Sequence, residues 1–342
     1  MRAWLAPVAL ALGGACALLG WFDPSRFFAA YLTGVLMWIG VPLGALALVM
    51  THALTGGAWG LAVRGTLEPA VRTLAWWPLL LLPLFAGLPH LYPWARPAEV
   101  ARDAILAHRA VWMNPALVVQ RTAAFLVLWW LTGRLMRTRA RSAVAGPGLV
   151  LLLFSVTLFA VDWGMSLDTR FASGAYGLIM ALSQVLAALA LSVLVLAREG
   201  PGPAPGDLGN LLLGFLMMFA YVAYAQFLVV WSGNLPAEVA YYAPRTAGGW
   251  RAYVAILFVA QFACPFGMLL APTLKGRIER LARPAALILA ARFFYTYWLV
   301  MPAFTPGLAP HLLDLAAPGF VGAAWLWTFA RARAAWREEA RA

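Results

Sequence analysis

Residues Gly148 to Met165 read GLVLLLFSVTLFAVDWGM, a run of eighteen residues whose only charged side chain is the carboxylate of Asp162. An apolar run of this length is typical of a membrane-spanning helix, because about 20 such residues cross the hydrocarbon core. A charged group at that depth costs at least ~2.5–3.5 kcal/mol on insertion scales, so it usually faces the bundle interior and marks a proton or substrate path. The run therefore predicts a membrane helix with a functional carboxylate near its outer end.

Nine further apolar runs of similar length accompany the first. The chain of 342 residues is 63% hydrophobic and only 11% charged, whereas a soluble domain has about 25% charged residues. The ten predicted spans are Ala3–Trp21, Phe27–Met50, Thr73–Leu91, Val118–Leu135, Gly148–Met165, Gly174–Ala197, Leu208–Trp231, Trp250–Leu270, Ala285–Phe304 and Leu315–Ala330. Pro78, Pro83 and Pro89 predict a kink in the third span, and the tenth is short. The sequence predicts an all-α polytopic transmembrane bundle that forms a single integral membrane domain over residues 1–342.

The basic residues predict the orientation of these spans. Sixteen Lys and Arg side chains fall on one side of the predicted bundle and eight on the other, with Arg292 inside a span. The positive-inside rule places the richer side, and with it both termini, in the cytoplasm of a bacterial inner membrane. The net charge of +12 is thus spread over short loops, which argues against a nucleic-acid partner. The longest outer loop, Tyr92 to Leu117, is expected to hold a short surface helix over Pro97–His108.

Cysteine and histidine are too few and too scattered to ligate a redox centre. Cys16 and Cys264 lie in separate apolar runs, which supports neither a disulfide nor a cysteine-ligated metal site. Membrane-embedded haem needs axial ligands, commonly histidines, inside the bundle. The four histidines instead lie near span ends or in loops: His52, His90, His108 and His311. We expect no cofactor bound covalently or through metal ligation in this chain.

Polar residues inside the spans are the candidates for chemistry. Arg292 is the basic residue expected well inside a span, and Tyr295, three residues on, shares its helix face. Neutral polar groups are expected on four other spans: Gln120, Gln184, Gln226 and Gln261. These groups predict either a proton path or quinone headgroup site, or ordinary interhelical hydrogen bonds and a snorkelling arginine. Tryptophans such as Trp76, Trp77, Trp129 and Trp130 are expected in the interfacial belt or facing lipid.

Two motifs carry a family resemblance. The first is Asp162–Asp168 (DWGMSLD) followed by Ser173–Gly177 (SGAYG), and the second is Gln226–Glu238 (QFLVVWSGNLPAE), with Trp298–Pro302 (WLVMP) further on. Together they resemble the ActF subunit of bacterial alternative complex III, also called quinol:cytochrome c oxidoreductase quinone-binding subunit 2. That subunit belongs to the NrfD/polysulfide-reductase-type superfamily of membrane anchors. The likeness is strongest over residues 148–304.

The resemblance implies a non-haem subunit of a complex that oxidises menaquinol or ubiquinol. Its expected partners are an iron–sulfur/molybdopterin-like subunit, multihaem and monohaem c-type cytochromes, a paralogous NrfD-like membrane subunit and, as a direct acceptor, a haem-copper oxidase. This chain would contribute to quinol interaction, to a proton half-channel, or to both.

The candidate residues fall into two groups. The proton-path candidates are Asp162, Asp168, Tyr224, Gln226 and Glu238, with Asp168 at the outer mouth. Arg292 and Tyr295 are candidates for a quinone site or polar cluster. Asn234 is expected to cap or turn the chain after the seventh span.

Two other functions fit the same composition. One is the membrane anchor of a different NrfD-type molybdenum or polysulfide reductase, and the other is a secondary transporter built from inverted repeats. For the oxidoreductase, the sequence predicts that Asp162→Asn slows quinol-linked electron flow or proton release and leaves assembly intact.

Overall fold

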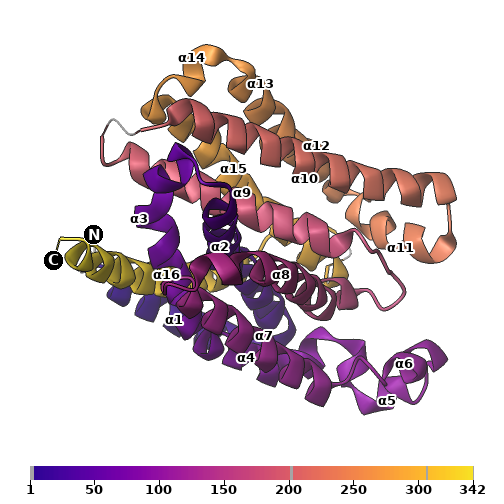
Figure 1. Cartoon of the computed structure of the whole chain (residues 1–342). Helices are drawn as coiled ribbons and strands as arrows, with labels where there is room; N and C mark the ends of the chain where they lie inside the picture. The colour runs from indigo at the N-terminus through magenta and orange to yellow at the C-terminus, as the bar shows by residue number, and fades with distance from the viewer. Residues whose placement is uncertain (1–3, 201–202, 306, 342) are drawn as a thin grey trace.

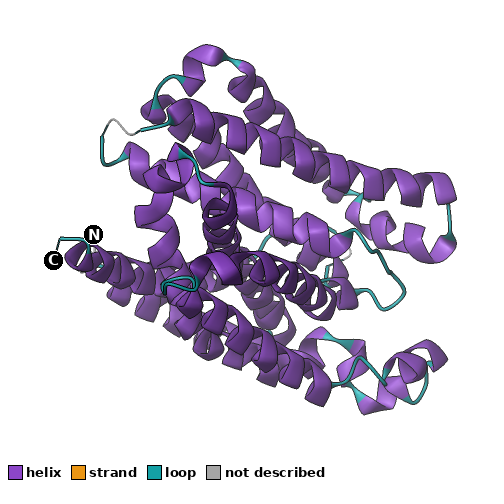
Figure 2. Ribbon diagram, in the orientation of Figure 1, coloured by secondary structure: helices purple, strands orange, loops and turns teal. Residues whose placement is uncertain are grey.

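The computed structural model describes residues 4–200, 203–305 and 307–341. Within these ranges every regular element is a helix, and no strand occurs (Figure 2). In chain order the elements are α1 (Leu5–Phe22), α2 (Pro24–Thr55), α3 (Ala58–Arg72), η1 (Thr73–Trp76), α4 (Trp77–Leu91), η2 (Pro93–Ala95), α5 (Pro97–Val100), α6 (Ala104–Arg109), α7 (Pro115–Leu135), α8 (Arg141–Trp163), η3 (Met165–Leu167), α9 (Tyr176–Ala197), α10 (Pro205–Gly233), α11 (Pro236–Arg245), α12 (Gly249–Phe258), η4 (Val259–Ala263), α13 (Cys264–Leu270), α14 (Pro272–Lys275), α15 (Ile278–Val300), η5 (Met301–Ala303) and α16 (Leu313–Glu339).

Ten helical stretches among the described residues are long and apolar enough to cross a membrane, which confirms the predicted helical bundle. The helix ends differ from the predicted ends because an apolar run marks the hydrocarbon core, whereas a helix continues into the polar interface. α8 begins at Arg141 and α15 at Ile278, each ahead of its predicted span. The tenth span is not short, because α16 extends for 27 residues. Ala3, the predicted start of the first span, lies outside the described residues.

The third span breaks where its prolines begin. α3 is an amphipathic helix that runs across the other helices near the end of the bundle where both termini lie (Figure 1). The chain then turns through η1 into α4, with Pro78 in the first turn of α4 and Pro83 and Pro89 inside that helix. Proline in the first turn lacks only an N–H that has no intrahelical partner, so it marks a helix start. The predicted span Thr73–Leu91 therefore corresponds to η1 and α4.

Helix α2 forms the centre of the bundle and packs against α9, α16, α3 and α8. Small residues on α2 allow this close approach, as is common between membrane helices. A Cβ added to Gly44 would lie 2.1 Å from the backbone oxygen of Gln184 on α9, and one added to Gly34 would lie 2.7 Å from the Cα of Pro318 on α16. These contacts fix the spacing of α2 from both neighbours.

Two pairs of helices flank this centre. α1 packs along α16, and on the opposite flank α10 packs against α13, which continues the span that begins with α12 (Figure 1). α10 and α12 bury few of their residues and expose large apolar side chains. A gap lined by side chains remains between α10, α12 and the central helices, and it holds the cavity described below.

Several side chains lie deeper than the sequence predicts. Trp77 and Trp129 are buried, the latter donating to the hydroxyl of Ser155 at 2.8 Å, whereas Trp76 and Trp130 are exposed as expected. A buried indole N–H usually needs a hydrogen-bond partner, and Ser155 provides one for Trp129. The predicted interfacial position did not require such a partner.

A second acidic residue, besides Asp162, is buried. Asp314, in the first turn of α16, is buried and accepts hydrogen bonds from Arg26 Nε at 2.8 Å and from the Tyr297 hydroxyl at 2.8 Å. This cluster joins α2, α15 and α16 at one end of the bundle.

Candidate functional site

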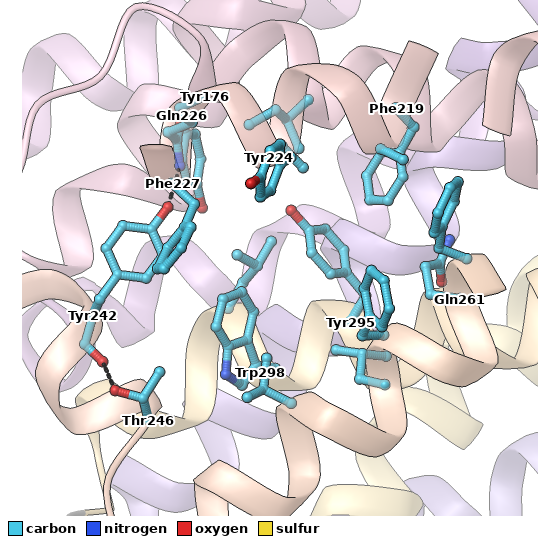
Figure 3. Close-up of a pocket in the computed structure, with 18 of the residues that line it drawn as sticks. Tyr176, Phe219, Tyr224, Gln226, Phe227, Tyr242, Thr246, Gln261, Tyr295 and Trp298 are labelled. Carbon is cyan, nitrogen blue, oxygen red and sulfur yellow. Dashed lines mark hydrogen bonds between the residues drawn. The ribbon is translucent and has the colours of Figure 1, made fainter. Parts of the chain in front are cut away.

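A cavity of about 520 Å³ lies between α9, α10, α11, α12, η4 and α15 (Figure 3). Its volume falls within the ~300–1,000 Å³ range of small-molecule sites. Ten of the 21 residues that line it are aromatic, namely Tyr176, Phe219, Tyr224, Phe227, Tyr241, Tyr242, Phe258, Phe262, Tyr295 and Trp298. Such a wall suits a flat, largely apolar ligand.

Tyr295 occupies the middle of this cavity. Its ring packs edge-on against Phe219, with centroids 5.3 Å apart, and its hydroxyl points towards the side where Tyr224 lies (Figure 3). Gln226 forms another part of the wall, and its Nε2 donates to the Tyr242 hydroxyl at 2.9 Å. Burial raises the pKa of Tyr242, which lies on α11 outside the membrane spans, to about 12. Tyr242 therefore keeps its hydroxyl proton at neutral pH.

Gln261 reaches the cavity from a single π-helical turn. The π-turn Val259–Ala263 interrupts the span formed by α12 and α13, and such turns occur frequently at functional sites because they re-aim side chains. Gln261 is 4% exposed, and its Oε1 has no hydrogen-bond partner among the described residues. A buried acceptor without a partner costs ~1–3 kcal/mol. A ligand that donates a hydrogen bond at this position would remove that cost.

Tyr241 adds a second buried polar atom without a partner. Its hydroxyl lies beside that of Tyr176 but does not meet the geometry of a hydrogen bond to any described residue, and the ring is held firmly. The Phe171 ring stacks on it at 3.9 Å, and the guanidinium of Arg245 lies 3.6 Å from its centroid. Two groups this close cannot share one face of the ring, so Tyr241 is clamped between them. Its position in the wall is therefore fixed.

Arg245 anchors this wall from behind. Its side chain is buried and donates to the backbone oxygens of Tyr241 at 2.7 Å and Leu299 at 3.0 Å. The indole of Trp298 donates in turn to the Arg245 carbonyl at 3.0 Å. These bonds tie α11 to the C-terminal end of α15.

The cavity opens sideways between α10 and α12. Tyr224 on α10 and Phe258 on α12 line it, and both are more than half exposed. Both helices carry further exposed apolar side chains, among them Met218, Val229 and Ile256. For a chain that crosses a membrane, this opening faces hydrocarbon or a partner subunit. A lipophilic ligand can enter from there without crossing water.

A second hollow of about 340 Å³ adjoins the first through Gln226, which lines both. The second hollow also contains Ser173 and the half-buried Glu238. Ser173 donates to Gln226 Oε1 at 2.7 Å, so Ser173, Gln226 and Tyr242 form one hydrogen-bonded chain between the two spaces. The structure thus brings together four of the predicted site residues: Tyr224, Gln226, Glu238 and Tyr295.

Arg292 lies close to this site without lining the cavity. Its guanidinium is buried, its Nη2 donates weakly to the Leu36 carbonyl at 3.4 Å, and its Nε and Nη1 have no partner among the described residues. A Cβ added to Gly40, near the middle of α2, would lie 3.5 Å from Nη2. Arg292 therefore places a positive charge at mid-depth, one helical turn before Tyr295.

Asp162 has a different environment. It is fully buried at the end of α8 and forms a two-pronged ion pair with Arg121 on α7, with Oδ1–Nη2 at 2.8 Å and Oδ2–Nε at 3.0 Å. Arg121 also donates to the Trp112 carbonyl at 3.0 Å and lies 4.2 Å from that ring. Asp162 is absent from the residues that line either cavity. Its proton-path role stays a prediction.

Asp168 and Asn234 mark turns. Asp168 is half-buried and accepts a hydrogen bond from the Arg170 backbone N–H at 3.1 Å. Asn234 ends α10 with φ +46°, in the left-handed region, as its predicted turn role requires. Asparagine tolerates this conformation better than most residues.

The sequence missed three residues of the site. The sequence counts Arg245 and Arg121 among the eight basic residues on the outer side, yet Arg245 is buried on α11, and Arg121 on α7 pairs with Asp162 on α8. Tyr241 also went unnoticed. One signal was available, because Tyr241 and Arg245 are four residues apart and so share a helix face. The sequence predicts a loop after the seventh span, and in a loop a spacing of four residues has no helical meaning.

Metal ligation finds no support within residues 4–200, 203–305 and 307–341, where no three His, Cys, Asp or Glu side chains come together. No family model matches the sequence, and no curated protein matches it.

Proposed function

We propose that this chain is the non-haem membrane subunit of a quinol-oxidising complex and that the aromatic cavity receives the quinol head group. The buried Oε1 of Gln261, without a hydrogen-bond partner in a largely apolar cavity, carries this proposal. A quinol presents a flat ring with two O–H donors, so it would supply the hydrogen bond that Gln261 lacks. Its isoprenoid tail would leave through the opening between α10 and α12.

Other polar and aromatic side chains of the cavity wall could contact the oxygens and the ring of the quinol. The hydroxyl of Tyr295 and the unpartnered hydroxyl of Tyr241 both belong to residues in the cavity wall, and each can accept from or donate to a quinol oxygen. Aromatic rings favour offset or edge-on contact with another ring, which Phe219 and Trp298 can provide. These contacts would orient the head group and exclude water.

Quinol oxidation releases two electrons and two protons per molecule. Ser173 donates to Gln226 and Gln226 donates to Tyr242, and these residues lie between the cavity and the hollow that Glu238 lines. A flip of the Gln226 amide would reverse both hydrogen bonds, so that a proton could leave the cavity in this direction. Glu238 would accept one of the two protons, and the second would pass to solvent. The electrons would pass to the iron–sulfur and c-type haem partners that the family resemblance implies.

The test compares quinol binding by Gln261→Leu with binding by wild type in the purified complex. Leucine keeps the bulk of the side chain and removes the acceptor, so the dissociation constant for a short-tail quinol should rise about tenfold, the effect of one hydrogen bond. Gln120→Leu is the matched control, because Gln120 on α7 is exposed and lies outside the cavity. Binding is measured by quenching of tryptophan fluorescence, since Trp298 lines the cavity.

Two further results decide the outcome. Tyr295→Phe should also weaken binding, and haem reduction by quinol should slow in both variants once the partners are present. Unchanged binding and unchanged haem reduction in Gln261→Leu and Tyr295→Phe would refute the cavity as the quinol site. A purified chain that never associates with haem-bearing subunits would refute the oxidoreductase role.

A further inference from the structure

A large basic hollow lies at the end of the bundle opposite α5 and α6. It measures about 1130 Å³ and is formed by α3, the end of α7, the loop between α7 and α8, and the end of α16. α3 lies across the other helices at this end of the bundle, beside the hollow (Figure 1). Six arginines line it: Arg64, Arg72, Arg134, Arg137, Arg139 and Arg141.

Two of these arginines are already neutralised. Arg64 pairs with Glu68 at 2.7 Å, and Arg72 forms a two-pronged pair with Glu339, with its Nη2 at 2.6 Å. Glu68 also accepts from the Trp336 indole at 2.8 Å. These bonds join α3 to the end of α16 and form a fixed wall, because both carboxylates in the hollow are held by side chains of that wall.

The other four arginines have no carboxylate partner among the described residues. They are Arg134, Arg137, Arg139 and Arg141, all within eight residues at the α7–α8 turn. Six arginines and two glutamates leave the hollow with a net charge of +4. Partial burial, and after it the charges of Arg72 and Arg134, lower the pKa of Arg137.

The hollow also has an apolar rim. Leu61 on α3 and Leu131 on α7 line it, and both are among the exposed large apolar side chains of the protein. Leu131 lies one turn before Arg134, on the side towards the hydrocarbon core. A ligand here would meet guanidinium groups at one end and apolar side chains at the other, which is the division found in a phospholipid.

We propose that this hollow binds the head group of an anionic phospholipid that carries two phosphodiester groups. Guanidinium groups pair with phosphate oxygens in two-pronged geometry, and basic pockets between helices at the cytoplasmic surface bind such lipids. The four arginines without carboxylate partners can pair with both phosphates in two-pronged geometry, and their charge exceeds that of the two phosphates. The volume of the hollow is larger than one phosphate would fill. The lipid would bridge α3, the α7–α8 turn and α16.

The test is native mass spectrometry of the full chain, with any subunits that co-purify, in mild detergent. The delipidated protein is titrated with three probes: a diphosphate lipid of the cardiolipin type, phosphatidylglycerol and inorganic phosphate. The binding variant is Arg137→Gln/Arg139→Gln, because both side chains are exposed and make no ion pair within the described chain. The control, Arg277→Gln/Arg283→Gln, removes the same charge at exposed positions outside the hollow.

We expect the diphosphate lipid to bind with a stoichiometry of one and the variant to bind it about 30-fold more weakly, since each basic residue near an anionic lipid contributes about a factor of five. The control should bind as wild type does. If the variant and the control lost the same affinity for the diphosphate lipid, the effect would come from general surface charge, and the proposal would be overturned. Equal affinity for phosphatidylglycerol or for inorganic phosphate would overturn the diphosphate assignment. Thermal unfolding of both double variants confirms that each is folded.

Discussion

Replacing Asp162 by Asn tests what the buried carboxylate contributes. The change removes one charge from a pair in which both carboxylate oxygens accept from Arg121. Asparagine retains one acceptor, and its amide nitrogen would face a guanidinium N–H, donor against donor. Breaking a buried ion pair from one side costs ~3–5 kcal/mol. Arg121 keeps its Trp112 carbonyl and ring contacts and is partly exposed, so we expect the lower end, ~3 kcal/mol.

A double-mutant cycle isolates this pair. Arg121→Gln alone leaves the Asp162 carboxylate buried without its counter-charge and should cost at least as much as Asp162→Asn. Combining the two should cost less than the sum by ~1.5–3 kcal/mol, because two neutral amides can hydrogen-bond to each other. The free energy of unfolding is measured in mixed micelles for all four proteins.

Electron flow is measured in the same preparations, per folded complex. If Asp162→Asn leaves the unfolding free energy unchanged while quinol-linked proton release falls, the ion-pair reasoning is refuted and the carboxylate belongs to a proton path. If stability falls by the expected amount and turnover per folded complex is unchanged, Asp162 fastens α7 to α8.

Three further predictions follow from the packing and the turns. Gly44→Ala should lower the melting temperature sharply, by the equivalent of ~1–3 kcal/mol, because its Cβ would collide with the Gln184 backbone, whereas Gly14→Ala, with open space around it, should be neutral. Burial raises the pKa of Tyr242 to about 12 from an ordinary value of 10.0. The stability that this shift provides is complete below pH 10 and is lost as the pH rises towards 12. Tyr242→Phe should therefore flatten that part of a plot of unfolding free energy against pH. Asn234→Gly should retain or raise stability and Asn234→Ala should lower it by ~1 kcal/mol, since φ is +46° there; thermal unfolding distinguishes them.

Arg121 and Arg245 show what the sequence can predict about a charged side chain and what it cannot. A charge count from the sequence assigns Arg121 and Arg245 to the outer side of the membrane. Whether such a side chain meets water, a carboxylate or a carbonyl depends on which helix packs beside it, and hydropathy contains no such information. Arg121 pairs with Asp162, forty-one residues away in the sequence, and Arg245 donates to the Leu299 carbonyl, fifty-four residues away.

Gln261 shows the same limit at the candidate site. Its residue type and its place in an apolar run predict a polar group at depth, and nothing local distinguishes it from Gln120, which is exposed. The π-turn and the position of α10 decide that one glutamine faces a cavity. By contrast, Tyr224, Gln226, Glu238 and Tyr295 were predicted as site residues, and the structure gathers them around two adjoining spaces.

The sequence by itself determined the helical membrane architecture, because the requirement to bury about 20 apolar residues per span is local and cumulative along the chain. It also determined that charge inside the spans is scarce and therefore informative. Only the tertiary structure decided that Asp162 is paired with Arg121, that Gln261 is left without a partner in an aromatic cavity, and that four arginines converge beside α3. Those outcomes depend on contacts between residues far apart in the chain, which are set by how helices pack rather than by what each helix contains.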